Sequence, residues 1–130
     1  MKKVLFVCVH NAGRSQMAEA LFNLIANNGV RAESAGTKPA SEVNPVVVQA
    51  MAEVGIDIST NRPRLLTFEM IEDSERVITM GCGVEESCPA SFVPSEDWEL
   101  DDPAGQPIEK VRQIRDEIKS RVQQLLRELN

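Results

Sequence analysis

A short apolar stretch that ends in a cysteine constrains the fold of this chain more than any other feature. Residues 4–7 (VLFV) are uninterrupted apolar residues, which predict a short buried strand. Cys8 follows directly, and residues 15–25 carry apolar side chains at helical spacing. The sequence therefore predicts a strand that ends at Cys8, a loop of five residues between Cys8 and Arg14, and a helix that begins beside that loop.

The loop between this strand and helix (CVHNAGRS, residues 8–15) favours the binding of an oxyanion. Successive backbone N–H groups can point inward, and a helix N-terminus adds partial positive charge. Arg14 supplies a planar, two-pronged donor, and Gly13 lets the backbone approach an anion closely. The predicted oxyanion-binding residues are Val9, His10, Asn11, Ala12, Gly13, Arg14 and Ser15.

The same surroundings predict a reactive thiol at Cys8. A cysteine at a helix N-terminus beside an arginine ionises readily, and the thiolate is the nucleophile. Ser15 could donate its hydroxyl to that thiolate or cap the helix. The alternative is a buried core cysteine at a strand end, but Arg14 and Ser15 at this spacing favour catalysis. His10 could add positive charge, although a local hydrogen bond or exposure to solvent is the favoured interpretation.

Composition sets the class of protein. A chain of 130 residues fits one domain (1–130) with a real core, and 42% hydrophobic residues are ordinary for a globular protein. The sequence has no run of about 18 apolar residues, so no transmembrane helix is predicted. The N-terminal apolar stretch is too short for a signal peptide. These features predict a cytoplasmic protein. The net charge of −6 argues against nucleic acid and anionic membranes as partners.

Strands and helices alternate along the rest of the chain. Strands are predicted at residues 30–36 and 76–80, with a short fourth strand near residues 91–93 or Trp98. Further helices are predicted to begin at Pro45, after Thr67 and at Pro107. This alternation predicts a three-layer α/β domain with a parallel sheet, whose ligands bind at the carboxyl ends of the strands.

The two longer predicted helices each have an apolar face. In the helix that begins at Pro45 the inward residues are expected to be Val47, Val48, Met51 and Val54. In the C-terminal helix the apolar face consists of Ile108, Val111, Ile114, Ile118, Val122, Leu125 and Leu129.

Two further features could carry chemistry. Cys82 and Cys88 have five residues between them in a glycine-flanked segment after the third predicted strand. They could lie on the same sheet edge as Cys8 or be unremarkable reduced cysteines, and the absence of a Cys-x-x-Cys pair makes a metal site the weaker interpretation. Asp101 and Asp102 precede Pro103. A carboxylate beside a bound oxyanion could protonate a leaving group, but the residues alone favour a solvated acidic turn.

The loop CVHNAGRS resembles the signature loop of the low-molecular-weight protein tyrosine phosphatases and of the arsenate reductases built on that fold. The resemblance extends to residues 16–20, 34–36 and 54–59 and to the Asp102-Pro103 pair. It implies a four-stranded parallel sheet in the order 2-1-3-4, as in flavodoxin-like folds. It also implies that Asp102 is the general acid.

Two features favour the reductase branch. The reductases add two redox cysteines in the loop after the third strand, which matches Cys82 and Cys88. The phosphatases place a tyrosine after the Asp-Pro pair, whereas this chain has Ala104 there and no tyrosine at all. A phosphatase of the same fold and a non-enzymatic module that binds oxyanion or arsenite remain the alternatives. Relative to many members, this chain inserts Gly81 before Cys82, and the spacing to Cys88 is one residue shorter than in the best-known branch.

The resemblance implies a thiol relay that detoxifies arsenate. Cys8 attacks arsenic, Asp102 protonates the departing hydroxide, Cys82 attacks Cys8, and Cys88 attacks Cys82. An external thiol donor, thioredoxin in the first instance, then reduces the final disulfide. No bound cofactor is implied, and a monomer is expected.

The resemblance also bears on a metal site. Some members hold a structural potassium ion near the signature loop, and Asn11, Glu19 and Ser34 match residues of that site. Arg62 and Arg64 stand where its acidic ligand is expected, so no metal ion is predicted.

Overall fold

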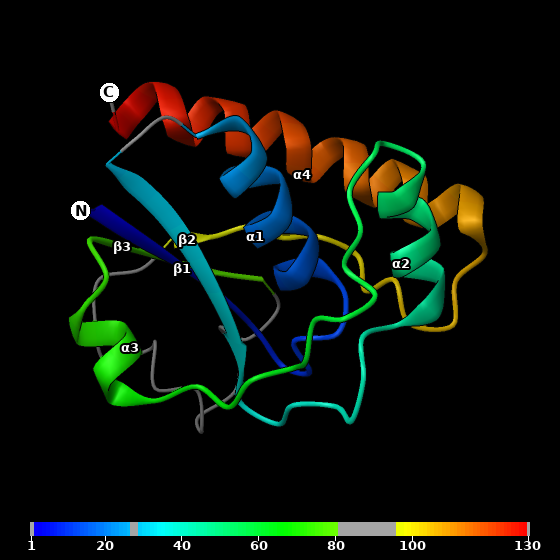
Figure 1. Ribbon diagram of the computed structural model, residues 1–130, viewed down its shortest axis with the longest axis horizontal. Coiled ribbons are helices and arrows are strands. Elements are labelled where there is room, and N and C mark those ends of the chain that lie inside the picture. Colours follow the sequence, from blue (N-terminus) through cyan, green and yellow to red (C-terminus); the bar gives the residue numbers. More distant parts are fainter. Residues whose placement is uncertain (1, 27–28, 81–95, 130) are drawn as a thin grey trace.

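The computed structural model describes residues 2–26, 29–80 and 96–129. Its elements follow in the order β1 (Lys2–Cys8), α1 (Arg14–Ile25), β2 (Val30–Gly36), α2 (Pro45–Ala52), α3 (Phe68–Glu72), β3 (Arg76–Thr79), β4 (Glu96–Asp97) and α4 (Ile108–Leu129). Figure 1 shows their arrangement, with α4 lying across α1 and α2.

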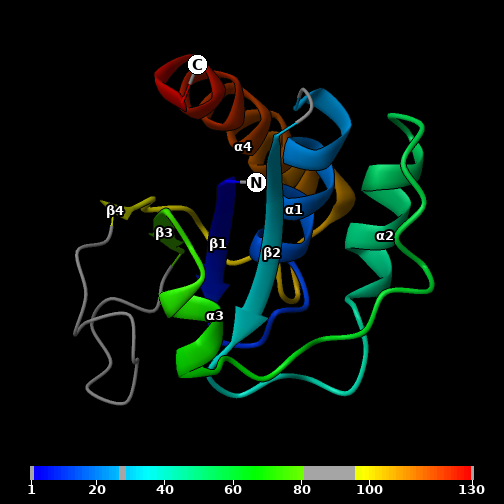
Figure 2. The ribbon, with the colours of Figure 1, turned by 60° about the vertical axis from the view of Figure 1, so that its left-hand side comes forward.

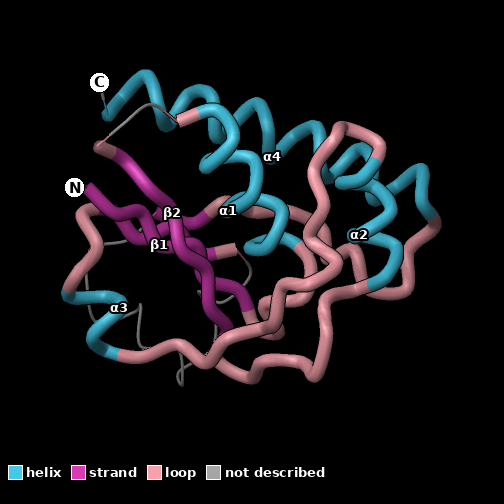
Figure 3. Tube along the Cα trace, viewed as in Figure 1, coloured by secondary structure: helices cyan, strands magenta, loops and turns pink. Residues whose placement is uncertain are grey.

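The four strands form one parallel sheet in the order β2-β1-β3-β4. Cys8 pairs with Gly36 of β2, and Val7 pairs with Thr79 of β3, so the carboxyl ends of these strands lie at one edge. The predicted fold class and strand order are both confirmed. Figure 3 shows the long loops after β1 and β2 gathered at this edge.

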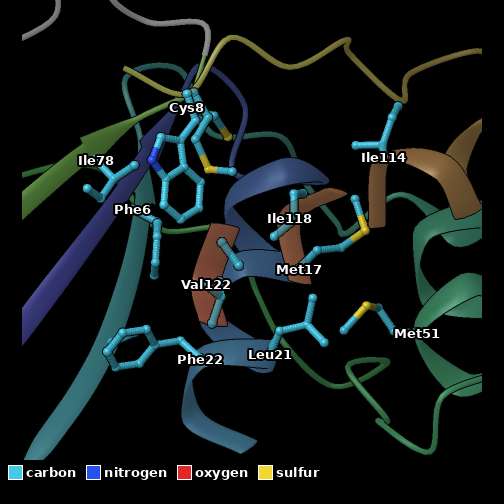
Figure 4. Close-up of a cluster of buried hydrophobic side chains, with 14 of the residues drawn as sticks. Phe6, Cys8, Met17, Leu21, Phe22, Met51, Ile78, Ile114, Ile118 and Val122 are labelled. Carbon is cyan, nitrogen blue, oxygen red and sulfur yellow. The ribbon is translucent and has the colours of Figure 1, made fainter. Parts of the chain in front are cut away.

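The sheet lies between two layers of helices. Alternate residues of β1 point to opposite faces of the sheet, so each face packs against its own helices. Phe6 and Cys8 belong to a large apolar cluster with α1, α2 and α4, which Figure 4 shows in close-up. Leu5 and Val7 pack on the other face with Ile71 of α3. Figure 2 shows α3 apart from the layer formed by α1 and α4.

Local chemistry explains where the helices begin. Asn44 caps α2 by accepting a hydrogen bond from the Val46 N–H, and Pro45 occupies the first helical position, where its missing N–H costs nothing. The Thr67 hydroxyl caps α3 by accepting from the Met70 N–H. The sequence predicted both starts correctly, because capping is decided by neighbours along the chain.

Two expectations about helix faces need correction, and the expected fourth strand near Trp98 is confirmed. Val54 is 40% exposed, because α2 ends at Ala52 and the helical spacing does not continue into the following turn. In α4 the buried stripe includes Leu126, while Ile108 and Leu129 are only partly buried at the two ends. The fourth strand is Glu96–Asp97, directly before Trp98, whereas residues 91–93 lie outside the described part of the chain.

No helix among the described residues is both long enough and apolar enough to cross a membrane.

Candidate active site

Cys8 is the last residue of β1, and its thiol is buried with two polar contacts. Its Sγ lies 2.8 Å from Ser15 Oγ and accepts a hydrogen bond from the Asn11 N–H at 3.1 Å. The Cys8 sulfur thus lies beside one amide donor and one hydroxyl. Ser15 therefore contacts the thiol and does not cap the helix, because α1 begins one residue earlier at Arg14.

The backbone of the loop is fixed by its carbonyl groups. Four of them accept hydrogen bonds from the segment after β2, at 2.8–3.3 Å: Cys8 O from Thr37, Val9 O from Lys38, His10 O from Ala40 and Ala12 O from Asn44. In a trans peptide the N–H points away from the carbonyl, and the described chain has no cis peptide. The amides that follow these carbonyls therefore point to the opposite side, as the Asn11 N–H does toward Cys8, and form a cradle for an anion.

Asn11 holds the loop in an unusual conformation. Its φ is 51°, the left-handed region that asparagine tolerates better than most residues. Its Nδ2 donates to Ser15 Oγ at 2.7 Å, and its Oδ1 accepts from Gln16 Nε2 at 3.1 Å and from the Arg64 N–H at 2.9 Å. A left-handed non-glycine residue costs about 1–3 kcal/mol and persists where its surroundings over-determine it. Here the three hydrogen bonds of the Asn11 side-chain amide hold the residue in this conformation.

Arg14 joins the loop to the segment that carries the predicted acid. Its Nη1 donates to the carbonyl of Leu100 at 3.0 Å, and its Nη2 lies 3.8 Å from Asp102 Oδ2. The Arg14 side chain is only 11% exposed. The guanidinium is thus held at the mouth of the loop, where its remaining donors can meet an anion.

The two neighbouring carboxylates have different surroundings. Asp102 lines the same cavity as Cys8, and its Oδ1 accepts a hydrogen bond from the Ala104 N–H at 3.0 Å. Asp101 pairs instead with Lys110 Nζ at 2.6 Å, and this hydrogen bond holds the pKa of Asp101 below its usual range. Of these two carboxylates, only Asp102 lines the cavity.

Gly13 is required by packing. A Cβ at this position would lie 2.6 Å from Pro103 Cγ, well inside any real contact. The structure adds a second reason for a glycine here, because Gly13 makes room for Pro103, and the expected close approach to an anion stays a prediction. Because Gly13 has no side chain, Pro103 packs directly against the loop, and Asp102 beside it lines the cavity.

The cavity above Cys8 is small, at about 40 Å³. It is lined by Cys8, His10, Ala12, Gly13, Arg14, Asn44, Asp102, Pro103 and Ala104. None of these residues is phenylalanine, tyrosine or tryptophan, and Ala104 occupies the wall directly after the Asp-Pro pair. This cavity suits a tetrahedral oxyanion and offers no surface for stacking an aromatic ring.

The remaining predicted residues are placed as follows. His10 is exposed and its Nδ1 lies 3.1 Å from the Lys38 carbonyl, which is the local hydrogen bond that the sequence favoured. Val9 uses its carbonyl to hold the loop. Cys82 and Cys88 lie outside the described residues. Sequence reasoning missed Asn44 as a lining residue, because its capping motif already accounted for it.

The residues near the loop do not fit a potassium ion. The Glu19 carboxylate accepts from Ser34 Oγ at 2.9 Å, and its same oxygen lies 3.2 Å from Arg64 Nη2. A guanidinium therefore occupies the place beside Glu19 where a cation would bind. No group of three acidic, histidine or cysteine side chains is arranged to hold a metal within the described ranges.

Comparison with known proteins agrees with this geometry. The family model described as low molecular weight phosphotyrosine protein phosphatase matches residues 3–130. The chain therefore belongs to the low molecular weight phosphotyrosine protein phosphatase family, and the resemblance seen in the signature loop is confirmed.

Relatives within the family include reductases and a phosphatase. The glutaredoxin arsenate reductase of Synechocystis sp. is 38% identical over 134 residues, which cover 100% of both chains. The thioredoxin-dependent arsenate reductase of Corynebacterium glutamicum has a TM-score of 0.79 and 41% identity, and the match covers 98% of this chain but only 60% of that one. The arginine phosphatase of Geobacillus stearothermophilus has a TM-score of 0.87 and 30% identity, with 99% and 93% covered.

Proposed function

We propose that this chain is an enzyme that reduces arsenate to arsenite with its own thiols and an external thiol donor. The observation that carries the proposal is the small cavity where Cys8, Arg14 and Asp102 meet, whose described lining residues include no phenylalanine, tyrosine or tryptophan. Arsenate is a tetrahedral oxyanion of the kind that such a cradle accepts. Arsenate reductases at 38% and 41% identity support the reaction class.

The first step uses the described residues. Arsenate binds to the backbone amides of the loop, with Arg14 paired to its oxygens. The Cys8 thiolate forms a bond to arsenic, and the departing hydroxide takes a proton from Asp102 and leaves as water. The hydrogen bond from the Asn11 N–H and the contact with Ser15 Oγ hold the Cys8 sulfur in place for this step.

The electrons come from a second thiol. We propose that Cys82 attacks the Cys8 sulfur, so that the S–As bond breaks and its electron pair remains on arsenic. Arsenic is thereby reduced from As(V) to As(III) and leaves as arsenite, while two thiols are oxidised to a disulfide. Cys88 then attacks Cys82, which frees Cys8 and transfers the disulfide to the second pair.

An external thiol reduces that last disulfide, and no bound cofactor is needed. Thioredoxin is the donor we propose, and the dependence of the Corynebacterium enzyme on thioredoxin supports it. Glutaredoxin is the alternative, as the name of the Synechocystis relative indicates. We further propose a monomer in the cytoplasm with no nucleic acid or membrane partner.

A phosphatase is the second candidate, because the arginine phosphatase of Geobacillus has the same fold. A phosphatase would use Cys8, Arg14 and Asp102 and would need neither Cys82 nor Cys88. A module that only binds oxyanion or arsenite would need no acid, so the position of Asp102 in the cavity argues against it.

One pair of assays separates these candidates. Arsenate-dependent oxidation of NADPH is followed with thioredoxin and thioredoxin reductase, and repeated with glutaredoxin and glutathione. Hydrolysis of an aryl phosphate and of phosphoarginine is measured beside them, with Cys8→Ser as the inactive control. We expect arsenate-dependent turnover with at least one thiol system and weak hydrolysis. Rapid hydrolysis without arsenate turnover would assign the chain to the phosphatases.

A further inference from the structure

Glu19 is a partly buried carboxylate that the proposed reaction does not use. It lies on α1 one turn after Ser15, and its side chain is only 13% exposed. Burial raises the pKa of Glu19, although the hydrogen bond from Ser34 and the charge of Arg64 act in the opposite direction. A negative charge close to an oxyanion site repels the substrate unless a cation balances it.

Arg64 provides that cation and also contacts the loop. Its Nη2 lies 3.2 Å from Glu19 Oε1, while its backbone N–H donates to Asn11 Oδ1 at 2.9 Å. Its carbonyl accepts from the Gly36 N–H at 2.8 Å, so the backbone of Arg64 is fixed to the end of β2. One residue therefore pairs with the partly buried carboxylate and with the residue that shapes the loop.

A continuous series of hydrogen bonds leads from Arg64 to the thiol. Asn11 accepts from Arg64 and donates to Ser15 Oγ at 2.7 Å, and Ser15 Oγ lies 2.8 Å from Cys8 Sγ. Asn61 supports the same amide through Gln16, because Asn61 Nδ2 donates to Gln16 Oε1 and Gln16 Nε2 donates to Asn11 Oδ1. The position of the 61–64 segment therefore affects the orientation of Asn11.

We propose that the Arg64 guanidinium is a built-in cation that takes the place of a potassium ion, balances Glu19 and thereby anchors the residue whose main-chain N–H positions Asn11 for the reaction of Cys8. A guanidinium is always charged and belongs to the chain, so the site needs no metal at any salt composition. Arg64 is a positioning residue, since it acts on the thiol through Asn11. The inference rests on the proposed role of Cys8, and alkylation of the thiol tests it even if the chain reduces no arsenate.

The test removes the two charges separately and together. The variants are Arg64→Gln, Glu19→Gln and the double variant, with Arg62→Gln as the matched control on a neighbouring exposed arginine. Reduced protein is treated with iodoacetamide, and modification of the Cys8 peptide is timed by mass spectrometry, which distinguishes Cys8 from Cys82 and Cys88. Each rate is measured in potassium chloride and in tetramethylammonium chloride at equal ionic strength.

We expect the parent and Arg62→Gln to react equally fast in both salts. Arg64→Gln should alkylate roughly tenfold more slowly, the scale of one charge-assisted hydrogen bond. The double variant should recover most of this rate, because removing Glu19 removes the charge that Arg64 balances. A parent that needs potassium, an Arg64→Gln variant that reacts like the parent, or a double variant no faster than Arg64→Gln would each overturn the proposal.

Discussion

Asn11 connects the nucleophile to a segment more than fifty positions further along the chain, at Arg64. The sequence alone predicted Cys8, Arg14 and Ser15 as neighbours, because they share one loop and its helix. It could not predict that Asn11 Oδ1 would accept a hydrogen bond from the Arg64 N–H. That contact depends on how the long loop after α2 folds back onto the sheet.

The two adjacent carboxylates give a prediction at the scale of single residues. Asp102 lines the cavity, so Asp102→Asn should lower kcat for arsenate by roughly 10²–10⁴-fold, the usual contribution of a general acid. The loss should appear in the step that expels hydroxide, because that step takes the proton. Steady-state rates across a pH series, with arsenate and thioredoxin, measure the effect.

Asp101→Asn is the matched control, because it removes a carboxylate that is already paired with Lys110. It should leave kcat within about twofold of the parent, in line with a surface ion pair of small energy. If Asp101→Asn were the more damaging change, the acid would be assigned to the wrong member of the pair.

At the scale of elements, the contact between Gly13 and Pro103 joins the two loops that carry the chemistry. Gly13→Ala should push Pro103, and with it Asp102, away from Cys8. We expect kcat to fall by up to roughly a hundredfold, because displacements of about 1 Å at a reacting centre can cost this much. Kinetics of the folded variant measure the effect.

Gly55→Ala is the control for a general loss of stability. Gly55 has a φ of +83° with open space around it, so a Cβ there costs about 1–2 kcal/mol of backbone strain without touching the site. Its melting temperature should drop while its kcat stays unchanged. Full activity in Gly13→Ala would show that Pro103 does not set the position of Asp102.

A second element-scale prediction concerns the junction of α2 and α4 and its pH dependence. Glu53 accepts hydrogen bonds from Arg112 and Arg115, and chiefly the bond from Arg112 lowers the pKa of Glu53 from 4.5 to about 2. A carboxyl group whose pKa is lower in the folded than in the unfolded protein stabilises the fold at pH values above its unfolded pKa. That contribution is lost as the pH falls through the folded pKa. Stability should therefore decline as the pH falls from about 4.5 to about 2.

Urea unfolding at neutral pH and inside this window tests the junction. Glu53→Gln should be less stable than the parent at neutral pH, and the difference should shrink toward acid. Glu117→Gln, which removes an exposed pair with Arg121 on α4, should show little of this pattern. If the free energies of unfolding of Glu53→Gln and the parent differed by the same amount at every pH, the carboxylate charge would not stabilise the contact between α2 and α4.

At the scale of the whole molecule, the fold followed from the sequence more completely than the site did. The parallel sheet was predicted from the alternation of strands and helices, and its order from the resemblance to a known family. Val54 was misplaced because apolar spacing does not reveal where a helix ends. The Gly13–Pro103 contact was missed, since it joins distant parts of the sequence, and only the resemblance brought Arg64 near Glu19. The assignment of residues 1–130 to one domain stays a prediction.

The measurement that tests the central claim most directly is a single-turnover reaction of Cys88→Ser with arsenate. If Cys82 attacks Cys8 and Cys88 acts one step later, reduced Cys88→Ser should release about one arsenite per protein and stop. Peptide mapping by mass spectrometry should then find a Cys8–Cys82 disulfide. Cys82→Ser should form no such disulfide, and phosphate-ester hydrolysis should be equal in both variants and the parent. Continuous turnover of Cys88→Ser with thioredoxin would contradict the three-cysteine relay.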